Sequence, residues 1–209
     1  DGGALSKRLG SLSIASLRES GLEPLAVDCH AALIGTSDAI EPHLSLDDLA
    51  ALFAPSKISA SPAKFDADEL AGLNAKLLHI TPYDAVSERL KALDIKGGEA
   101  FWLAVRGNLE KFNDVSTWWD IVAKAAVPKI EDSEFTNKAA ELLPEEPWDD
   151  TMWSTWTKAI KTETGAKGRA LFHPLRLALT GRDNGPELKP LMAIMGRDRV
   201  LARLKGETA

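Results

Sequence analysis

Apolar side chains recur at spacings of three and four residues along most of this 209-residue chain. Trp102, Val105, Leu109 and Phe112 follow this spacing, which puts them on one face of a helix. A half-buried strand would alternate apolar and polar residues with a period of two, and no segment sustains that alternation. The sequence therefore predicts an all-α fold.

Capping residues indicate where the predicted helices begin and end. Ser45 and Asp66 are each followed three residues later by a carboxylate, a pattern typical of a helix N-terminus. They predict helices over about 46–53 and 67–79. Further helices are predicted from Pro82 to about Leu93, from Glu99 through Phe112, around Trp118 and Trp119, from Met152 to Thr162, and from about Leu171 to Gly181, with Pro186 near another start.

Five of the six tryptophans lie in these predicted helices, and Trp102, Trp153 and Trp156 recur there at core-facing spacing. Tryptophans beside cations can stack on unpaired bases, but large aromatic side chains are more often packed inside a fold. Their helical spacing favours packing in a core.

Cys29 is the only cysteine, which excludes an internal disulfide and a cysteine-rich zinc site. It lies in a helix-like apolar stretch, which predicts a small buried side chain with His30 beside it on the polar face. We expect no metal site. No apolar run approaches the roughly 20 residues that span a bilayer, so we expect a cytoplasmic protein without a membrane partner.

Charge is distributed unevenly along the chain. The formal net charge is -6, which argues against binding of nucleic acid by the chain as a whole. Residues 158–205, however, hold eleven Lys and Arg against four Asp and Glu. This segment is a candidate phosphate-binding surface, and a solvated helical surface is the alternative.

A basic loop lies near the N-terminus, where Leu5-Ser6-Lys7-Arg8 is flanked by glycines. Glycine lets a backbone take unusual conformations, and Lys and Arg can follow negative charge that develops during phosphoryl transfer. A second run lies far downstream, at Phe172-His173-Pro174-Leu175-Arg176-Leu177-Ala178-Leu179-Thr180-Gly181, followed by Gly185-Pro186-Glu187-Leu188.

In this order, the two runs resemble the second signature loop and the C-terminal end of bacterial glutamyl-tRNA synthetases, which are class I aminoacyl-tRNA synthetases. Ala4 stands where that family usually has Lys. The resemblance implies a C-terminal portion without the catalytic Rossmann domain. It also implies four parts, namely a loop remnant at 1–13, a stem-contact region at 14–96, and two subdomains of a helical-cage anticodon-binding domain at 97–146 and 147–209.

The resemblance implies two groups of functional residues. Ser6, Lys7 and Arg8 would serve the ATP step, with Lys7 stabilising the transition state at the α-phosphate. ATP with Mg²⁺ would bind the full-length enzyme, and no cofactor is expected on this portion alone, which should not aminoacylate. The tRNA anticodon would contact Arg176, Gly185, Pro186, Leu188 and Arg106.

For Arg176 the alternative is a salt bridge inside the helical bundle. Gly107, next to Arg106, predicts a close approach by another backbone, either that of a packed helix or that of a nucleotide.

The implied partner is tRNA, with glutamate and ATP bound only when the catalytic domain is present, no DNA, and a monomeric state. Two other interpretations stay open. One is a free-standing helical RNA-binding or scaffold module. The other is a synthetase for glutamine, whose anticodon region would be built from β-barrels rather than helices.

Overall fold

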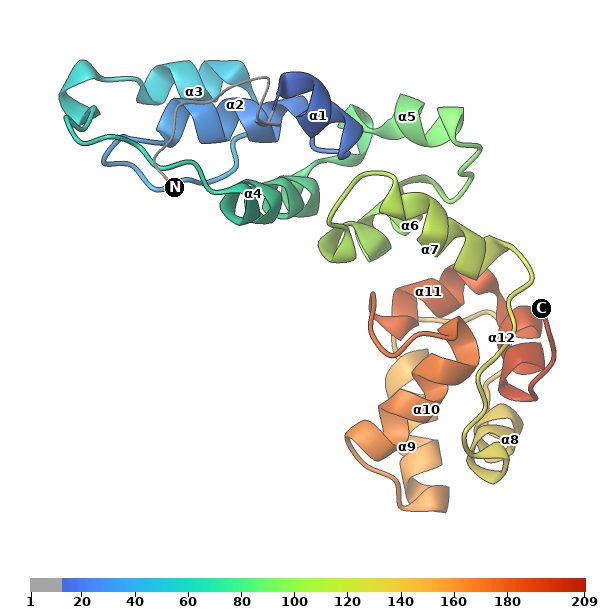
Figure 1. The fold of residues 1–209 in the computed structure, drawn as a ribbon. Helices are drawn as coiled ribbons and strands as arrows, with labels where there is room; N and C mark the ends of the chain where they lie inside the picture. The colour runs from blue at the N-terminus through green and yellow to red at the C-terminus, as the bar shows by residue number, and fades with distance from the viewer. Residues whose placement is uncertain (1–12) are drawn as a thin grey trace. The chain divides into compact units, whose positions relative to one another are not determined.

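The computed structural model describes residues 13–209 and is built from α-helices joined by turns and by longer loops (Figure 1). Those residues contain no strand, only an isolated antiparallel bridge between Thr36 and Ile58. The predicted all-α fold is confirmed. The α-helices are α1 (Ile14–Glu19), α2 (Pro24–Leu33), α3 (Leu46–Leu52), α4 (Ala67–Ile80), α5 (Ser87–Ala92), α6 (Gly98–Val105), α7 (Asp114–Ala123), α8 (Ser133–Glu141), α9 (Met152–Thr164), α10 (Arg169–Thr180), α11 (Leu188–Met195) and α12 (Arg197–Leu204).

The chain divides into two compact units that interleave in sequence. The first contains the chain up to Glu88 together with Arg106–Val115, and the second contains Arg89–Val105 together with Ser116–Ala209. Asn74 explains why 106–115 belongs to the first unit, because its buried amide nitrogen donates to the carbonyl of Glu110 at 2.6 Å. The domain boundaries inferred from sequence stay predictions.

Helices α3 and α4 of the first unit begin where their capping residues predict. The Ser45 hydroxyl accepts a hydrogen bond from the backbone of Asp48, and the Asp66 carboxylate accepts from Asp68 and Glu69. Each cap satisfies backbone N–H groups that the first helical turn leaves without a partner. These local signals therefore fixed both helix starts.

Cys29 is fully buried in the first unit, as predicted, within an apolar cluster formed with Leu33, Leu49 and Leu73. Its burial raises the pKa of the thiol. The prediction for His30 was wrong, because its side chain is also buried and its Nε2 lies 3.3 Å from the Glu69 carboxylate. Because Glu69 on α4 gives the imidazole a polar partner, the His30 side chain can be buried instead of lying on the polar face of its helix.

Two predicted helices are shorter than their sequence patterns. The segment after Pro82 forms a 3₁₀ turn, η3 (Tyr83–Ala85), before α5 starts, because Val86 leaves helical geometry and buries its side chain. Likewise α6 ends at Val105 and continues as a 3₁₀ turn, η4 (Arg106–Asn108). Gly107 and Asn108 are weak helix formers, which explains this early end. Leu109 and Phe112 are nevertheless buried, as their spacing suggested.

The second unit has a core of large side chains contributed by α6 and α8–α12. Trp102 and Trp156 are fully buried, in agreement with the packing interpretation. Trp153 is only half-buried. The indole nitrogen of Trp156 donates to the carbonyl of Ala139 at 2.9 Å, which joins α9 to α8 inside the core.

Replacing Trp156 by phenylalanine should lower the free energy of unfolding by about 1–2 kcal/mol, because the buried Ala139 carbonyl loses its donor and the smaller ring leaves space. Urea unfolding of the purified chain measures this loss. Trp153→Phe is the matched control, since the half-buried Trp153 indole should tolerate the same exchange with a smaller change. Equal losses for the two variants would contradict the role given to the Ala139 bond.

Candidate nucleic-acid interface

Helix α10 of the second unit supplies most of the candidate site. It starts after Gly168, with φ of 52°, and ends at Gly181 in a left-handed conformation with φ of 66°. The side facing the core holds Leu171, Leu175, Ala178 and Leu179. Another side carries residues spaced by three and four positions, which lie next to one another on a helix. They are Arg169, Phe172, His173 and Arg176.

The loop over residues 181–187 is fastened to α10 by side-chain hydrogen bonds. The Thr180 hydroxyl donates to the Arg176 carbonyl at 2.7 Å and accepts from the backbone of Arg182 at 3.2 Å. The Arg176 Nη1 donates to the carbonyl of Pro186 at 2.9 Å. We call this set of bonds the loop clamp. It holds the loop that carries Gly185 and Pro186 beside Arg176.

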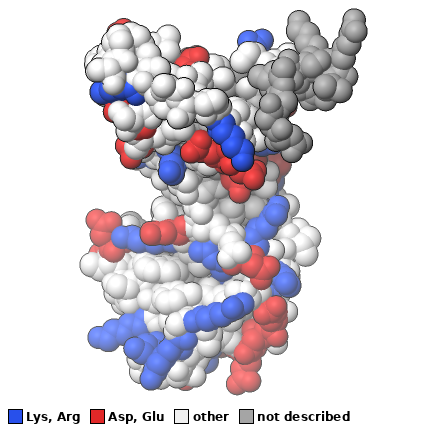
Figure 2. All heavy atoms as spheres, turned by 60° about the vertical axis from the view of Figure 1, so that its left-hand side comes forward, with Lys and Arg blue, Asp and Glu red and all other residues white. Residues whose placement is uncertain are grey.

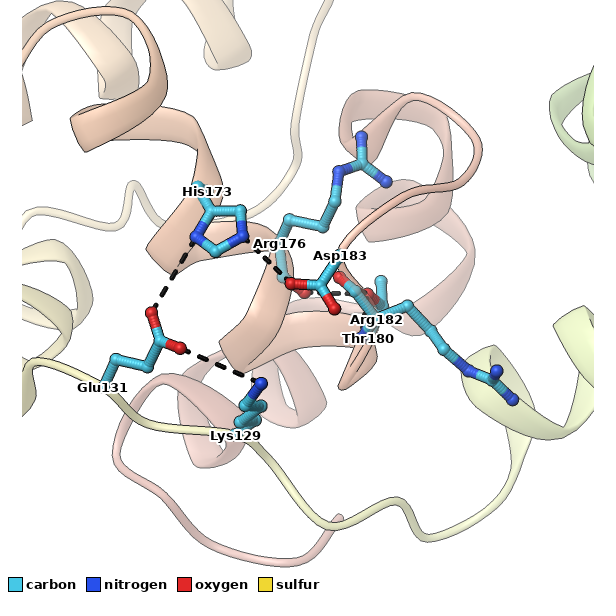
Figure 3. Close-up of polar contacts among 7 residues, drawn as sticks. All are labelled: Lys129, Glu131, His173, Arg176, Thr180, Arg182 and Asp183. Carbon is cyan, nitrogen blue, oxygen red and sulfur yellow. Dashed lines mark hydrogen bonds and ion pairs between the residues drawn. The ribbon is translucent and has the colours of Figure 1, made fainter.

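His173 extends the clamp in two directions (Figure 3). Its Nε2 lies 3.1 Å from the carboxylate of Asp183 in the loop, and its Nδ1 lies 3.8 Å from the carboxylate of Glu131. Glu131 in turn lies 3.8 Å from the ammonium of Lys129. Through this row of polar side chains, α10 is linked both to the Asp183 carboxylate in the loop and to the segment that precedes α8.

Arg176 is partly buried at the edge of α10, and that burial lowers the pKa of its guanidinium. Among residues 13–209 it forms no ion pair, so the salt bridge considered as an alternative is not seen there. One of its nitrogens is used by the Pro186 carbonyl. The fork of an arginine has five donors, so further donors remain for a ligand.

Two hollows border this side of α10. The first, which we call the polar hollow, has a volume of about 530 Å³ and is lined by Arg169, Phe172, His173, Arg176, Asp183 and Asn184. The second, the aromatic hollow, has a volume of about 290 Å³ and is lined by Trp153, Phe172, Arg176, Glu187, Leu188 and Lys189. Phe172 and Arg176 belong to both linings, so the two hollows are neighbours.

The structure brings four of the predicted anticodon residues together. Arg176, Gly185, Pro186 and Leu188 all lie at the loop clamp or in its hollows, with Pro186 and Leu188 buried. A Cβ built on Gly185 would lie 2.1 Å from an atom of the Trp118 ring, so the loop lies tightly against α7.

The remaining predicted residues lie elsewhere. Arg106 is in η4 of the first unit, where its Nη1 donates to the carbonyl of Thr81 at 2.8 Å. No packed helix approaches Gly107, because nothing lies within 4 Å of a Cβ built there, so that half of the prediction is wrong and the approach of a nucleotide stays a prediction. Gly107 lies in the 3₁₀ turn that ends α6, and this turn accounts for a glycine at that position. Ser6, Lys7 and Arg8 lie outside the described residues.

Several cations of the basic segment are used inside the second unit. Arg203 is fully buried, and Arg199 donates to the carbonyls of Val122 and Ala123. Arg197 pairs with Glu145 at 2.7 Å, and Lys189 pairs with Asp150 at 3.3 Å. The cations that stay exposed are Lys158, Lys161, Lys167, Arg169, Arg182 and Lys205. Figure 2 shows Lys and Arg side chains at the surface of the molecule, interspersed with Asp and Glu.

Residues 13–209 show neither a metal-binding cluster nor a membrane-spanning helix. No group of three or more His, Cys, Asp or Glu side chains there is arranged to hold a metal ion. No helix in the same range is long and apolar enough to cross a membrane.

Comparison with known proteins identifies the origin of this arrangement. A family described as an anticodon binding domain matches residues 108–207, which include α10 and the loop clamp. A glutamate-tRNA ligase 2 from Methylorubrum populi is 52% identical over all of this chain, and one from Xanthobacter autotrophicus is 51% identical, again over all of it. The chain belongs to the glutamate-tRNA ligase family. It corresponds to the C-terminal part of these enzymes and spans about half of their length, 47% and 46% respectively.

Solved glutamate-tRNA ligases share the fold. The structure from Elizabethkingia meningosepticum superposes with a TM-score of 0.75 over 98% of this chain and 48% of that one, at 19% identity. The structure from Elizabethkingia anophelis gives 0.69 over 96% of this chain and 43% of that one, at 18% identity. The helical architecture is therefore common to this family at low sequence identity.

The sequence reasoning missed several residues of the site in this glutamate-tRNA ligase homologue. They are Arg169, Phe172, His173, Asp183 and Asn184. The sequence indicates part of this set, since residues 169, 172, 173 and 176 recur at spacings of three and four and so lie on one side of a helix. The contribution of Asp183 and Asn184 was not detectable, because their position depends on how residues 181–187 fold back.

Proposed function

We propose that this chain is the tRNA-recognition part of a glutamate-tRNA ligase, an enzyme that uses ATP to join glutamate to tRNA. The observation that carries the proposal is the loop clamp. It presents Arg176 at the edge of the polar hollow, within the segment that matches an anticodon binding domain. Anticodon bases are unpaired, so a protein can read their edges with arginine and backbone groups.

Arg176 is the proposed principal reader of an anticodon base. Its free donors face a base edge, while its bond to the Pro186 carbonyl fixes the guanidinium plane. Gly185, Pro186 and Leu188 shape the adjoining surface. Arg106 is proposed as a further anticodon contact through the donors that the Thr81 carbonyl does not use.

The ATP step is assigned to Ser6, Lys7 and Arg8, together with the part of the enzyme that this chain does not span. ATP with Mg²⁺ and glutamate are the proposed ligands of the whole enzyme, which we place in the cytoplasm with tRNA and without DNA as a partner. We expect this chain to be a monomer that binds tRNA and does not aminoacylate by itself.

The test is a titration of the 209-residue chain with glutamate tRNA and with the same tRNA carrying an exchanged anticodon, at two salt concentrations. We expect Arg176→Ala to weaken binding of the native tRNA about 10-fold and to abolish the preference for its anticodon, since a base-reading arginine contributes about 1–3 kcal/mol of discrimination. Arg176→Lys should keep the charge and still lose the preference.

Lys161→Ala is the matched control, because Lys161 is an exposed cation on α9 outside both hollows. Its loss should weaken both tRNAs equally, and more so at low salt. Binding that ignores the anticodon and responds only to salt would instead favour a general RNA-binding surface. Thermal unfolding of each variant confirms that the fold is retained.

A further inference from the structure

Phe172 is a large aromatic side chain at the surface of α10, with 42% of its area exposed. Its ring stacks on that of Trp153 from α9, with centroids 6.1 Å apart and planes inclined by 23°. Trp153 meets the fully buried Trp156 edge-on at 5.8 Å, and Trp156 is hydrogen-bonded in the core. The exposed ring is therefore backed by a rigid aromatic column.

The two hollows on either side of Phe172 differ in chemistry. The polar hollow offers the donors of Arg169, the acceptor of Asp183 and the amide of Asn184, which can both donate and accept. The aromatic hollow is lined by Trp153, Phe172 and Leu188, together with the charged side chains of Arg176, Glu187 and Lys189. Hydrogen-bonding groups distinguish base edges, whereas apolar and aromatic walls accept any base face.

Asp183 is held in place before any ligand arrives. Its carboxylate lies 3.1 Å from His173, whose other nitrogen lies 3.8 Å from Glu131 (Figure 3). An acceptor that is already held in position favours a ligand with a hydrogen-bond donor at the matching place, because the acceptor does not have to rearrange when the ligand binds. The aromatic hollow has no comparable acceptor fixed by a side-chain network.

From these observations we infer that Phe172 separates two neighbouring unpaired nucleobases of the bound RNA. One base enters the polar hollow and is selected through Asp183 and Asn184. The adjacent base stacks in the aromatic hollow against Phe172 and Trp153, with little selection for its identity. Arg176 borders both positions. This inference rests on the proposed function and adds to it a stacking site and a division between a selective and a tolerant position.

Phe172→Leu tests the stacking site, because it keeps an apolar side chain and removes the ring. The probe is the anticodon stem-loop RNA of glutamate tRNA, bound to the full 209-residue chain. We expect the variant to bind about 10-fold more weakly, within the range for one base–aromatic stack. An abasic nucleotide at the stacked position should weaken binding to the unaltered chain and have little further effect on Phe172→Leu.

Asp183→Ala tests the selective position. It should reduce discrimination among the four bases at one loop nucleotide adjacent to the stacked one, where Asn184 and Arg176 still contact the base, and leave discrimination elsewhere unchanged. Phe53→Leu is the control, since Phe53 lies in the first unit with 70% of its area exposed. It should bind the stem-loop as the unaltered chain does.

The outcomes separate this inference from the proposed function. If the unaltered chain prefers the native anticodon and Phe172→Leu binds it equally well, the stacking site is wrong while the proposed function stands. If the unaltered chain shows no preference for the native anticodon loop, both are overturned. Circular dichroism melting of Phe172→Leu shows whether a weaker affinity reflects loss of fold, and we expect an unchanged transition because the ring is exposed.

Discussion

Arg203→Met should lower the free energy of unfolding by about 3–4 kcal/mol, the largest stability loss expected for a single change in the second unit. Arg203 is fully buried and donates to the carbonyls of Leu179 at 2.7 Å, Lys124 at 3.0 Å and Ala209 at 2.7 Å. Methionine has a similar length but cannot donate, so the carbonyls of Leu179 and Lys124 lose the Arg203 donor, and the Ala209 oxygen keeps only the backbone N–H of Ala126 at 2.9 Å. Burial, with a smaller contribution from Arg199, lowers the pKa of Arg203 to about 10, which leaves it charged at neutral pH.

Urea unfolding at neutral pH measures the effect of Arg203→Met. The matched control is Arg182→Met, because Arg182 is exposed and only its backbone takes part in the contacts described. Its change should stay within about 0.5 kcal/mol. Arg203→Lys should fall between the two, since an ammonium keeps the charge but cannot reach three separate carbonyls. A midpoint for Arg203→Met equal to that of Arg182→Met would refute this role.

Gly185→Ala should both destabilise the loop clamp and impair RNA binding. A Cβ at this position would lie 2.1 Å from the Trp118 ring, and the backbone φ of 149° lies in a region that favours glycine. Because overpacking and backbone strain each cost about 1–3 kcal/mol, we expect a loss of about 2–3 kcal/mol. The displaced loop would also move the Pro186 carbonyl away from Arg176, so binding of the anticodon stem-loop should weaken at least 10-fold.

A second substitution separates the two causes of the Gly185→Ala defect. Trp118→Leu makes room for the new methyl group, so the double variant should recover part of the stability lost by Gly185→Ala alone. Gly168→Ala is the control for strain, since Gly168 also has a positive φ but has nothing within 4 Å of a Cβ. If Gly168→Ala costs as much as Gly185→Ala, the contact with Trp118 is not the cause.

Most of the helices could be predicted from sequence because their signals are local. Ser45 and Asp66 cap the backbone three residues ahead, and the stop at Gly181 needs only a left-handed residue. The failures came where a tertiary contact overrides the local pattern. Val86 leaves the helix that Pro82 was expected to start, and its side chain is buried.

The candidate site was predictable only in part, for the same reason. Arg176 could be identified from the motif that contains it. Its hydrogen bond to the Pro186 carbonyl could not, because it forms only when the loop brings a residue ten positions later back to α10. The net charge of the basic segment also did not show which of its side chains are exposed. Arg203 counts as a surface cation in the sequence and is completely buried in the fold. Charge tallies cannot separate structural arginines from those that can meet phosphate.

The interleaving of the two units has a consequence for how such a protein can be divided. The chain leaves the first unit after residue 88, returns to it at residues 106–115 and then re-enters the second unit. Cutting the chain at one position therefore cannot produce a fragment that contains all of one unit and nothing of the other. A fragment that stops anywhere between 89 and 105 would lack the Glu110 carbonyl that the buried Asn74 amide requires. Exchange of either unit between related genes would therefore need several coordinated crossovers, and the two are expected to be inherited together.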